Sequence, residues 1–341
     1  MRKFEGYNKG VNLGGWLSQC LHDKKHYDTF ITEKDMKTAA SWGIDHVRVP
    51  IDFEVLETPD GKYKEEGFAY INSCLAWCET YRLNMILDLH KTAGYSFDEL
   101  GTSEGFFADE VLQQRFYKLW EQFAVRYGKY DDRLAFELLN EVVSENVRDS
   151  WNRISRQAVE RIRAVAPDIT ILIGGIWYNS TSAVKFLDMP YDRNIVYNFH
   201  NYDPILFTHQ SAHWVDGMPS DLVMEYPSTL SAFIDGTRIL DENMAISLRN
   251  PNLTKMGPEF FDATFAEAIK IAEDRDVPLY CGEYGVIDKA PLDSTLKWFS
   301  DIHSIFEKYG IGRAVWSYKD MDFGLTGSHY APILQDLVKL L

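Results

Sequence analysis

LAFELLNE, residues 134–141, joins an apolar run to a polar end. Apart from Glu137, the positions before Asn140 are apolar, which predicts a β-strand buried on both faces. Asn140 and Glu141 close the run with an amide and a carboxylate. In a parallel α/β barrel the functional side chains stand at the carboxyl ends of the strands, so the segment is typical of that fold.

The same alternation of apolar strand and longer helical segment recurs along the whole chain. The strand candidates are 10–16, 46–51, 84–90, 134–141, 170–175, 195–202, 278–286 and 311–319. The helix candidates are 32–42, 67–82, 110–130, 147–166, 181–188, 262–276, 293–309 and 332–340. Eight such units predict an α/β fold, a single catalytic (β/α)₈ TIM barrel over residues 1–341, ahead of a doubly wound open sheet.

A long insertion after the sixth strand, at about residues 203–261, interrupts this alternation. Loops of this length in a compact domain usually have a function or fold as a small subdomain, and we expect an insertion subdomain here. His209 and His213 have the spacing of a zinc-binding pair, but the stretch HQSAH lacks the glutamate of HExxH. We therefore expect no metal there.

Composition and charge exclude several classes of partner. The 341 residues carry a net charge of −16, which argues against binding to nucleic acid or to an anionic membrane surface. No apolar run approaches the roughly 18 residues that a spanning helix needs. Residues 1–6 lack the apolar core of a signal peptide, so the protein either stays inside the cell or has lost a signal. Localisation and oligomeric state stay open.

The ends of the predicted strands collect carboxylate, imidazole, amide and aromatic groups on one rim. In chain order they are Trp16, Arg48, Asp88, His90, Asn140, Glu141, Gly174, His200, Tyr202, Glu283 and Trp316. Glu141 and Glu283 end the fourth and seventh strands, on opposite sides of the ring. Glycoside hydrolysis requires such a pair, because one carboxyl group protonates the leaving oxygen while the other attacks or activates water.

Seven motifs, in this order along the chain, resemble those of glycoside hydrolase family 5. They are GVNLGGWL (10–17), DHVRVP (45–50), LDLH (87–90), FELLNE (136–141), YNFHNYDP (197–204), GEYGV (282–286) and AVWSYKDMDFG (314–324). The resemblance implies that Glu141 is the acid/base and Glu283 the nucleophile of a retaining hydrolase. It also implies a covalent glycosyl-enzyme and no metal or organic cofactor. Retention follows from the resemblance alone, because a sequence gives no distance between the carboxyl groups.

The resemblance further implies a set of residues around the two glutamates that bind a β-glucan polysaccharide or oligosaccharide. This substrate-binding set is Arg48, His90, Asn140, His200, Tyr202 and Trp316. The aromatic residues Trp16, Phe207 and Trp214 are further candidates to contact sugar rings. Glu137 points to the same side of its strand as Glu141 but lies deeper, and we interpret it as a structural partner of Arg48.

The motifs GVNLGGWL and FELLNE are shared by yeast-type exo-β-1,3-glucanases and by bacterial endoglucanases that cleave β-1,4 and mixed-linkage glucans. Residues 26–35 and 207–214 resemble the bacterial enzymes more closely. An insertion that narrows an open cleft into a pocket favours exo action, so the first expectation is an exo-β-1,3-glucanase-like enzyme. The alternatives are an endo-β-1,4-glucanase or lichenase of the cellulase type and, further off, a non-catalytic carbohydrate-binding barrel. The presence of both glutamates argues against the last.

Overall fold

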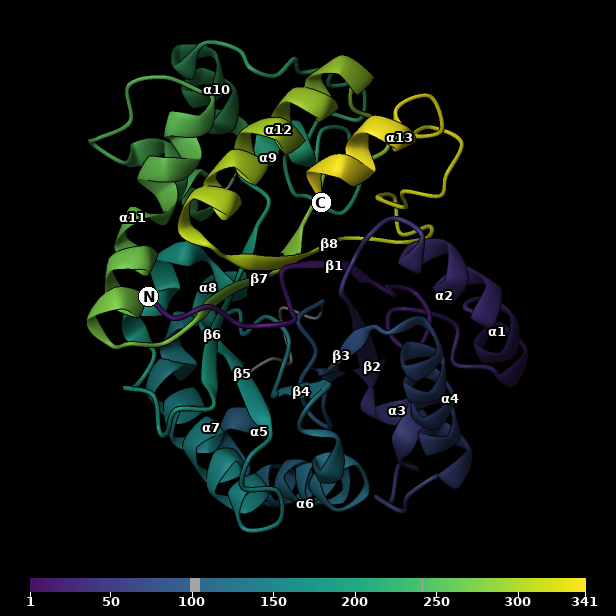
Figure 1. Cartoon of the computed structure of the whole chain (residues 1–341). Coiled ribbons are helices and arrows are strands. Elements are labelled where there is room, and N and C mark those ends of the chain that lie inside the picture. The colour runs from purple at the N-terminus through teal and green to yellow at the C-terminus, as the bar shows by residue number, and fades with distance from the viewer. Residues whose placement is uncertain (99–104, 241) are drawn as a thin grey trace.

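The computed structural model describes residues 1–98, 105–240 and 242–341. Eight parallel strands close into a barrel in chain order, with β1 paired to both β2 and β8, which confirms the predicted (β/α)₈ architecture (Figure 1). The strands are β1 (Lys9–Asn12), β2 (His46–Asp52), β3 (Asn84–Lys91), β4 (Leu134–Glu137), β5 (Thr170–Gly174), β6 (Ile195–Asn201), β7 (Leu279–Tyr284) and β8 (Gly312–Val315). Nearly all of their residues are buried, because helices cover the outside and side chains fill the inside.

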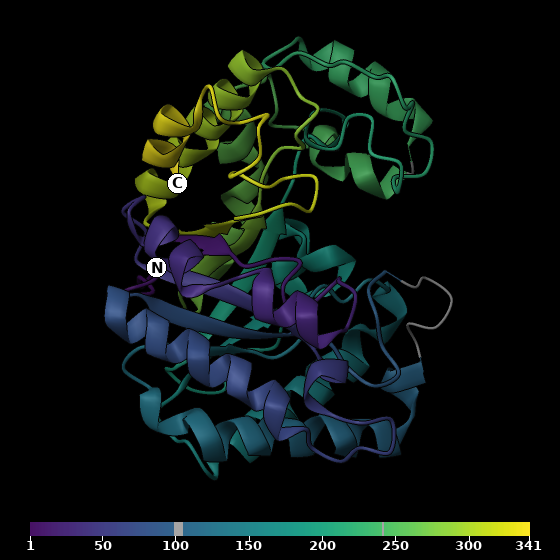
Figure 2. The same ribbon diagram turned by 90° about the vertical axis from the view of Figure 1, so that its right-hand side faces the viewer.

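Helices surround the barrel, and Figure 2 shows this outer layer from the side. The α-helices are α1 (Lys24–Thr29), α2 (Glu33–Ala40), α3 (Phe53–Leu56), α4 (Glu65–Tyr81), α5 (Gly105–Ala108), α6 (Glu110–Tyr127), α7 (Arg148–Arg163), α8 (Ile176–Asn179), α9 (Ile205–Thr208), α10 (Leu230–Gly236), α11 (Pro258–Asp274), α12 (Leu292–Tyr309) and α13 (Leu334–Leu337). Short 3₁₀ helices span Gly128–Tyr130, Glu145–Val147, Thr181–Phe186, Thr237–Ile239, Glu242–Arg249 and Val338–Leu340.

The helix ends follow local chemistry. Thr32 and Asp35 form a capping box at the start of α2, as the sequence pattern indicates. Gly310 ends α12 in the left-handed conformation, with φ of 66°, which glycine adopts without a steric penalty. The helix expected at 181–188 is a 3₁₀ helix instead, and the last expected helix divides into α13 and a 3₁₀ turn.

The barrel interior changes character along the strand direction. Its floor is an apolar cluster that includes two residues preceding β1: Phe4, Tyr7, Ile86, Ala135, Leu172, Val196, Tyr280 and Ala314. Side chains two positions apart on a strand share a face, so the next inward residues on β3, β4 and β6 are Asp88, Glu137 and Asn198. The apolar cluster therefore lies at the amino-terminal end of the barrel, and a polar layer follows it toward the carboxyl ends of the strands.

Several strands end earlier than their apolar runs. β4 ends at Glu137, so Glu141 belongs to the loop beyond the strand. The chain continues along the barrel edge through single backbone bonds, from Leu138 N to Leu172 O at 3.2 Å and from Asn140 N to Leu89 O at 3.2 Å. Gly15, with φ of 75°, turns the chain away after β1. These departures bring loop residues rather than strand residues to the rim.

The long insertion contains α9, α10 and two 3₁₀ helices, Thr237–Ile239 and Glu242–Arg249. Figures 1 and 2 both place α10 at the outer edge of the molecule. That the insertion, at about residues 203–261, forms a separate subdomain stays a prediction. Among the described residues, no helix is long and apolar enough to cross a membrane.

Trp16 packs outside the strands, among the first helices. Its side chain has no exposed surface, and its indole ring stacks on Trp77 at 6.0 Å and meets the edge of Tyr70 at 6.4 Å. Its Nε1 donates to the carbonyl oxygen of Tyr27 at 2.8 Å. The residue therefore links the α1 segment to α4.

We predict that Trp16→Phe lowers the free energy of unfolding by about 1–3 kcal/mol, because it removes a buried hydrogen bond and part of the ring. Denaturant unfolding followed by circular dichroism measures the change. Trp214→Phe is the matched control, since Trp214 is 44% exposed, and should shift the free energy by less than about 0.5 kcal/mol. Equal effects of the two substitutions would contradict the packing role.

Candidate active site

Arg48 occupies the centre of the polar layer and has no exposed surface. Its Nε and Nη2 donate to the two carboxylate oxygens of Glu137 at 2.7 and 2.8 Å. Nη1 donates to Asn12 Oδ1 at 2.9 Å and to Glu283 Oε1 at 2.8 Å, and Nη2 donates also to Asn140 Oδ1 at 3.0 Å. Every N–H of the guanidinium is therefore used. The interpretation of Glu137 as a structural partner of Arg48 is confirmed.

Glu283, near the end of β7, is held by two donors from other strands. Arg48 binds its Oε1, and the Tyr202 hydroxyl donates to Oε2 at 2.9 Å. Asn12 fixes the strand itself, because its Nδ2 donates to the carbonyl oxygen of Gly282 at 2.9 Å. Both carboxylate oxygens of Glu283 are thus oriented before any ligand binds.

Glu141 lies in the loop after β4 with a φ of 25°, a strained value for a residue with a side chain. The Tyr95 hydroxyl donates to its backbone carbonyl and helps to hold this conformation. Its Oε1 lies 2.7 Å from His200 Nδ1. This backbone conformation, held by Tyr95, and the contact with His200 direct the Glu141 carboxyl group toward Glu283.

The two carboxyl groups are close together. One ligand atom each from Glu141, His200 and Glu283 lie within 4.8 Å of one another. Retaining glycosidases place their carboxyl groups about 5–5.5 Å apart, whereas inverting enzymes need roughly 6.5–9.5 Å to admit a water molecule. One carboxylate oxygen of Glu141 thus lies within 4.8 Å of one of Glu283, and this closest approach is compatible with the retaining arrangement.

Burial and the charges around them give Glu141 and Glu283 different pKa values. Burial raises the pKa of Glu141 well above its usual value, and the adjacent negative charge of Glu283 raises that pKa further. Burial also raises the pKa of Glu283, but the charge of Arg48 and the hydrogen bond from the Tyr202 hydroxyl oppose that rise. Glu141 therefore keeps its proton when Glu283 has lost its own.

The same three ligand atoms satisfy the distances for a metal ion. A divalent cation there would lie close to the Arg48 guanidinium, whose Nη1 is 2.8 Å from Glu283, and like charges at that range repel strongly. The expectation that the site needs no metal stays a prediction.

Buried polar atoms without a protein partner mark where a ligand fits. Within the described residues, His90 Nε2, His200 Nε2 and Asn140 Nδ2 are buried and have no hydrogen-bond partner. The His90 ring lies parallel to Trp316, with centroids 5.9 Å apart and an interplanar angle of 5°. Buried polar groups are normally satisfied, so these atoms indicate a polar molecule that binds against an aromatic wall.

Two of the residues predicted from sequence to bind substrate lie elsewhere. Trp16 is fully buried among the first helices, because the Gly14–Gly15 turn directs its ring away from the barrel mouth. Phe207, on α9, is also fully buried and packs on Tyr226 at 5.4 Å inside the insertion. Both predictions were wrong, since each ring is fully buried and packs on aromatic side chains away from the two glutamates.

Trp214 is placed differently, at the end of a series of ring contacts that starts beside Glu283. Tyr202 meets His209 at 5.0 Å, and His209 meets Trp214 at 6.2 Å. His209 is buried, and burial lowers its pKa to about 3, so it packs as a neutral ring. The insertion thereby presents a partly exposed indole near the mouth of the barrel.

The sequence reasoning missed two residues of the loop after β3. Tyr95 holds the backbone of Glu141, and the Phe97 ring meets the edge of His90 at 5.0 Å. The only signal was their position directly after the motif that ends in His90.

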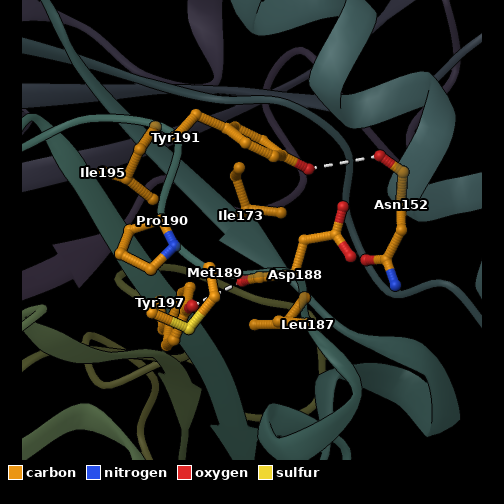
Figure 3. A pocket seen from close by; sticks show the side chains of 9 residues that line it. All are labelled: Asn152, Ile173, Leu187, Asp188, Met189, Pro190, Tyr191, Ile195 and Tyr197. Atoms are coloured by element: carbon orange, nitrogen blue, oxygen red, sulfur yellow. Dashed lines mark hydrogen bonds between the residues drawn. The ribbon is translucent and has the colours of Figure 1, made fainter. Parts of the chain in front are cut away.

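A small cavity lies away from this site, on the outer side of β5 and β6 (Figure 3). Its volume is about 10 Å³, which is room for one water molecule at most. It is lined by Asn152, Ile173, Leu187, Asp188, Met189, Pro190, Tyr191, Ile195 and Tyr197. The Tyr197 hydroxyl donates to Asp188 O at 2.5 Å and the Tyr191 hydroxyl to Asn152 O at 3.2 Å, so the cavity is a packing feature.

Comparison with known proteins gives consistent matches over nearly the whole chain. The model of the family described as cellulase (glycosyl hydrolase family 5) matches residues 5–322. Cellodextrinase A of Ruminococcus flavefaciens is 42% identical over 313 residues, which cover 92% of this chain and 86% of the relative. Endoglucanase C of Acetivibrio thermocellus is 41% identical over 340 residues, which cover 98% of each chain. The solved structure of the clostridial cellulose synthase subunit Z from Clostridioides difficile has a TM-score of 0.76 at 26% identity and covers 97% of this chain and 99% of that one.

We predict that Glu283→Gln lowers the pKa of Glu141, because the substitution removes the negative charge that opposes its ionisation. The pKa should stay above its usual value, since burial remains. Carboxyl ¹³C NMR titration of both proteins measures the shift. Asp132→Asn, at the opposite end of the barrel before β4, is the control and should leave the Glu141 titration unchanged. An unchanged or higher pKa in Glu283→Gln would contradict the coupling.

Proposed function

The chain belongs to glycosyl hydrolase family 5 and is a cellulase-type glycoside hydrolase, and on that premise we propose that it is a retaining endo-β-1,4-glucanase. Glu141 is the acid/base and Glu283 the nucleophile. The observation that carries the proposal is the close approach of the two carboxyl groups, one oxygen of each lying within 4.8 Å of one of the other. Arg48 binds one group, and a neutral histidine lies beside the other.

The reaction takes two displacements at the anomeric carbon. In the first, a carboxylate oxygen of Glu283 bonds to that carbon while the glycosidic bond breaks, and Glu141 gives its proton to the departing oxygen. In the second, Glu141 takes a proton from a water molecule whose oxygen attacks the same carbon. The bond to Glu283 then breaks, which releases a sugar of retained configuration.

The surrounding residues have distinct roles in this proposal. Arg48 and Tyr202 stabilise the Glu283 carboxylate and orient it, while His200 orients Glu141. Burial and the charge of Arg48 lower the pKa of His200 well below its usual value, so the ring stays neutral through both steps.

Four more residues bind the sugar in this proposal. Asn140 Nδ2, buried and unpartnered, donates to a hydroxyl beside the anomeric carbon, and His90 accepts a second hydroxyl contact. Trp316 supports the sugar that is cleaved. Trp214, 44% exposed on the insertion, provides a platform for a sugar further along the chain.

The relatives favour β-1,4 rather than β-1,3 linkage. Two proteins more than 40% identical to this chain are named as a cellodextrinase and an endoglucanase. The expectation of an exo-β-1,3-glucanase-like enzyme finds no support among them. That expectation depended on the insertion narrowing the cleft, because the motifs GVNLGGWL and FELLNE are shared by both groups of enzymes and do not report linkage.

We predict that carboxymethyl cellulose and cello-oligosaccharides are cleaved at internal bonds, while laminarin is cleaved at least about tenfold more slowly. Chromatography of early products measures both. The variant Trp214→Ala should lower kcat/KM on cellopentaose by about 3- to 30-fold and leave that on an aryl cellobioside unchanged, since only the longer chain reaches the indole. Glucose as the sole early product from laminarin would contradict the proposed linkage and mode.

We predict that Glu283→Ala abolishes turnover of aryl β-cellobiosides and that azide restores part of it, giving a glycosyl azide of inverted configuration. The small anion enters the space left by the carboxylate and attacks from the same side. Polarimetry or NMR of the product measures its configuration.

Glu141→Ala is the matched control for the nucleophile experiment. With a good leaving group it should still accumulate the glycosyl-enzyme, visible by mass spectrometry, because no proton is needed for the first step. An azide product of retained configuration from Glu283→Ala would overturn the assignment of the nucleophile.

A further inference from the structure

On the basis of the proposed function, we propose that Asp88 is a positioning residue that fixes the tautomer of His90. The Nε2 of His90 then accepts a hydrogen bond from a sugar hydroxyl. Asp88 and His90 are two residues apart on β3, so both side chains point into the barrel, the aspartate one level below the histidine.

Asp88 presents a single oxygen to two nitrogen groups. Its Oδ2 lies 2.6 Å from His90 Nδ1 and 3.0 Å from Nη2 of Arg48. The guanidinium is always charged and never accepts a hydrogen bond, so this oxygen faces a permanent positive charge. An oxygen next to a fixed cation serves as an acceptor, which places the ring proton of His90 on Nδ1. Nε2 is then left with its lone pair.

The His90 ring is held in one orientation. Trp316 lies parallel to one face, 5.9 Å away, and the edge contact with Phe97 is at 5.0 Å. The ring is 1% exposed, and burial lowers its pKa to about 4, so it is neutral and its two nitrogens differ in character. The tautomer therefore decides what the pocket offers to a ligand.

The buried, unpartnered Nε2 of His90 complements the unpartnered Nδ2 of Asn140. One is an acceptor and the other a donor, and a sugar hydroxyl is able to satisfy either. The opposite tautomer would turn Nε2 into a second donor and reverse the orientation of the hydroxyl proton that it binds.

The first test is the protonation pattern of His90, read from ring ¹⁵N NMR of protein labelled at histidine. The His90→Gln spectrum assigns the signals. Burial raises the pKa of Asp88 to about 7, so spectra are taken near pH 8, where the carboxylate form prevails. We expect the proton on Nδ1 in the native protein and in Asp88→Asn, whose amide oxygen still faces Arg48. In Asp88→Ala we expect both tautomers.

Asp98→Asn is the charge control. Asp98 lies in the loop after β3 and pairs with Lys91 at 3.0 Å, and it influences His90 only through its charge. It should leave the tautomer unchanged. A proton on Nε2 in the native protein would overturn the proposal, and that measurement needs no variant to fold. An unchanged pattern in a folded Asp88→Ala would overturn it equally.

The second test uses aryl β-cellobiosides that each lack one hydroxyl of the sugar to be cleaved. Removal of the hydroxyl that His90 binds should lower kcat/KM about 10- to 100-fold in the native enzyme. That penalty should disappear in Asp88→Ala and persist in Asp88→Asn. A penalty that persists in Asp88→Ala contradicts the positioning role. The NMR result is independent of the linkage cleaved, so failure of the proposed function and failure of this inference are distinguishable.

Discussion

The whole site depends on one buried cation. Arg48 has no contact with solvent, and an isolated charge in that position would cost several kcal/mol. Its cost is offset because Glu137, Asp88 and Glu283 surround it at 2.7–3.0 Å, while two amide oxygens take its remaining N–H groups. Residues of β1, β3, β4 and β7 contact Arg48, which itself lies on β2, so the complete set of partners is present only in the closed barrel.

The cation also explains why two carboxyl groups a few ångströms apart behave differently. Arg48 contacts Glu283 directly and only influences Glu141 from a distance. Two glutamates with the same chemistry thus acquire different proton affinities, and the direction of the difference follows from which one the guanidinium touches. The strained backbone of Glu141 contributes to this difference, because it brings the Glu141 carboxyl group close to Glu283 without a hydrogen bond from Arg48.

The sequence was sufficient to predict the barrel, since its apolar strand runs and helical segments alternate through the whole chain. The roles of Arg48 and Glu137 as partners were also predictable, because both are charged residues in otherwise apolar strands. Trp16 and Phe207 were misplaced for a physical reason. A ring beside a strand end faces either the mouth or the helix layer, and a glycine turn or a short helix decides which. Tyr95 acts through a hydroxyl contact to a backbone carbonyl, and such a contact leaves no pattern in sequence.

The apolar floor beneath the polar layer determines from which end of the barrel a ligand can reach the site. Phe4 and Tyr7 stack at 4.0 Å and, with Tyr280, fill the amino-terminal end of the barrel. A polymer consequently has no path along the barrel axis, and it can reach the two glutamates only from the mouth. The site is thus open at one end of the barrel only, and whatever enters by that end has to leave by it.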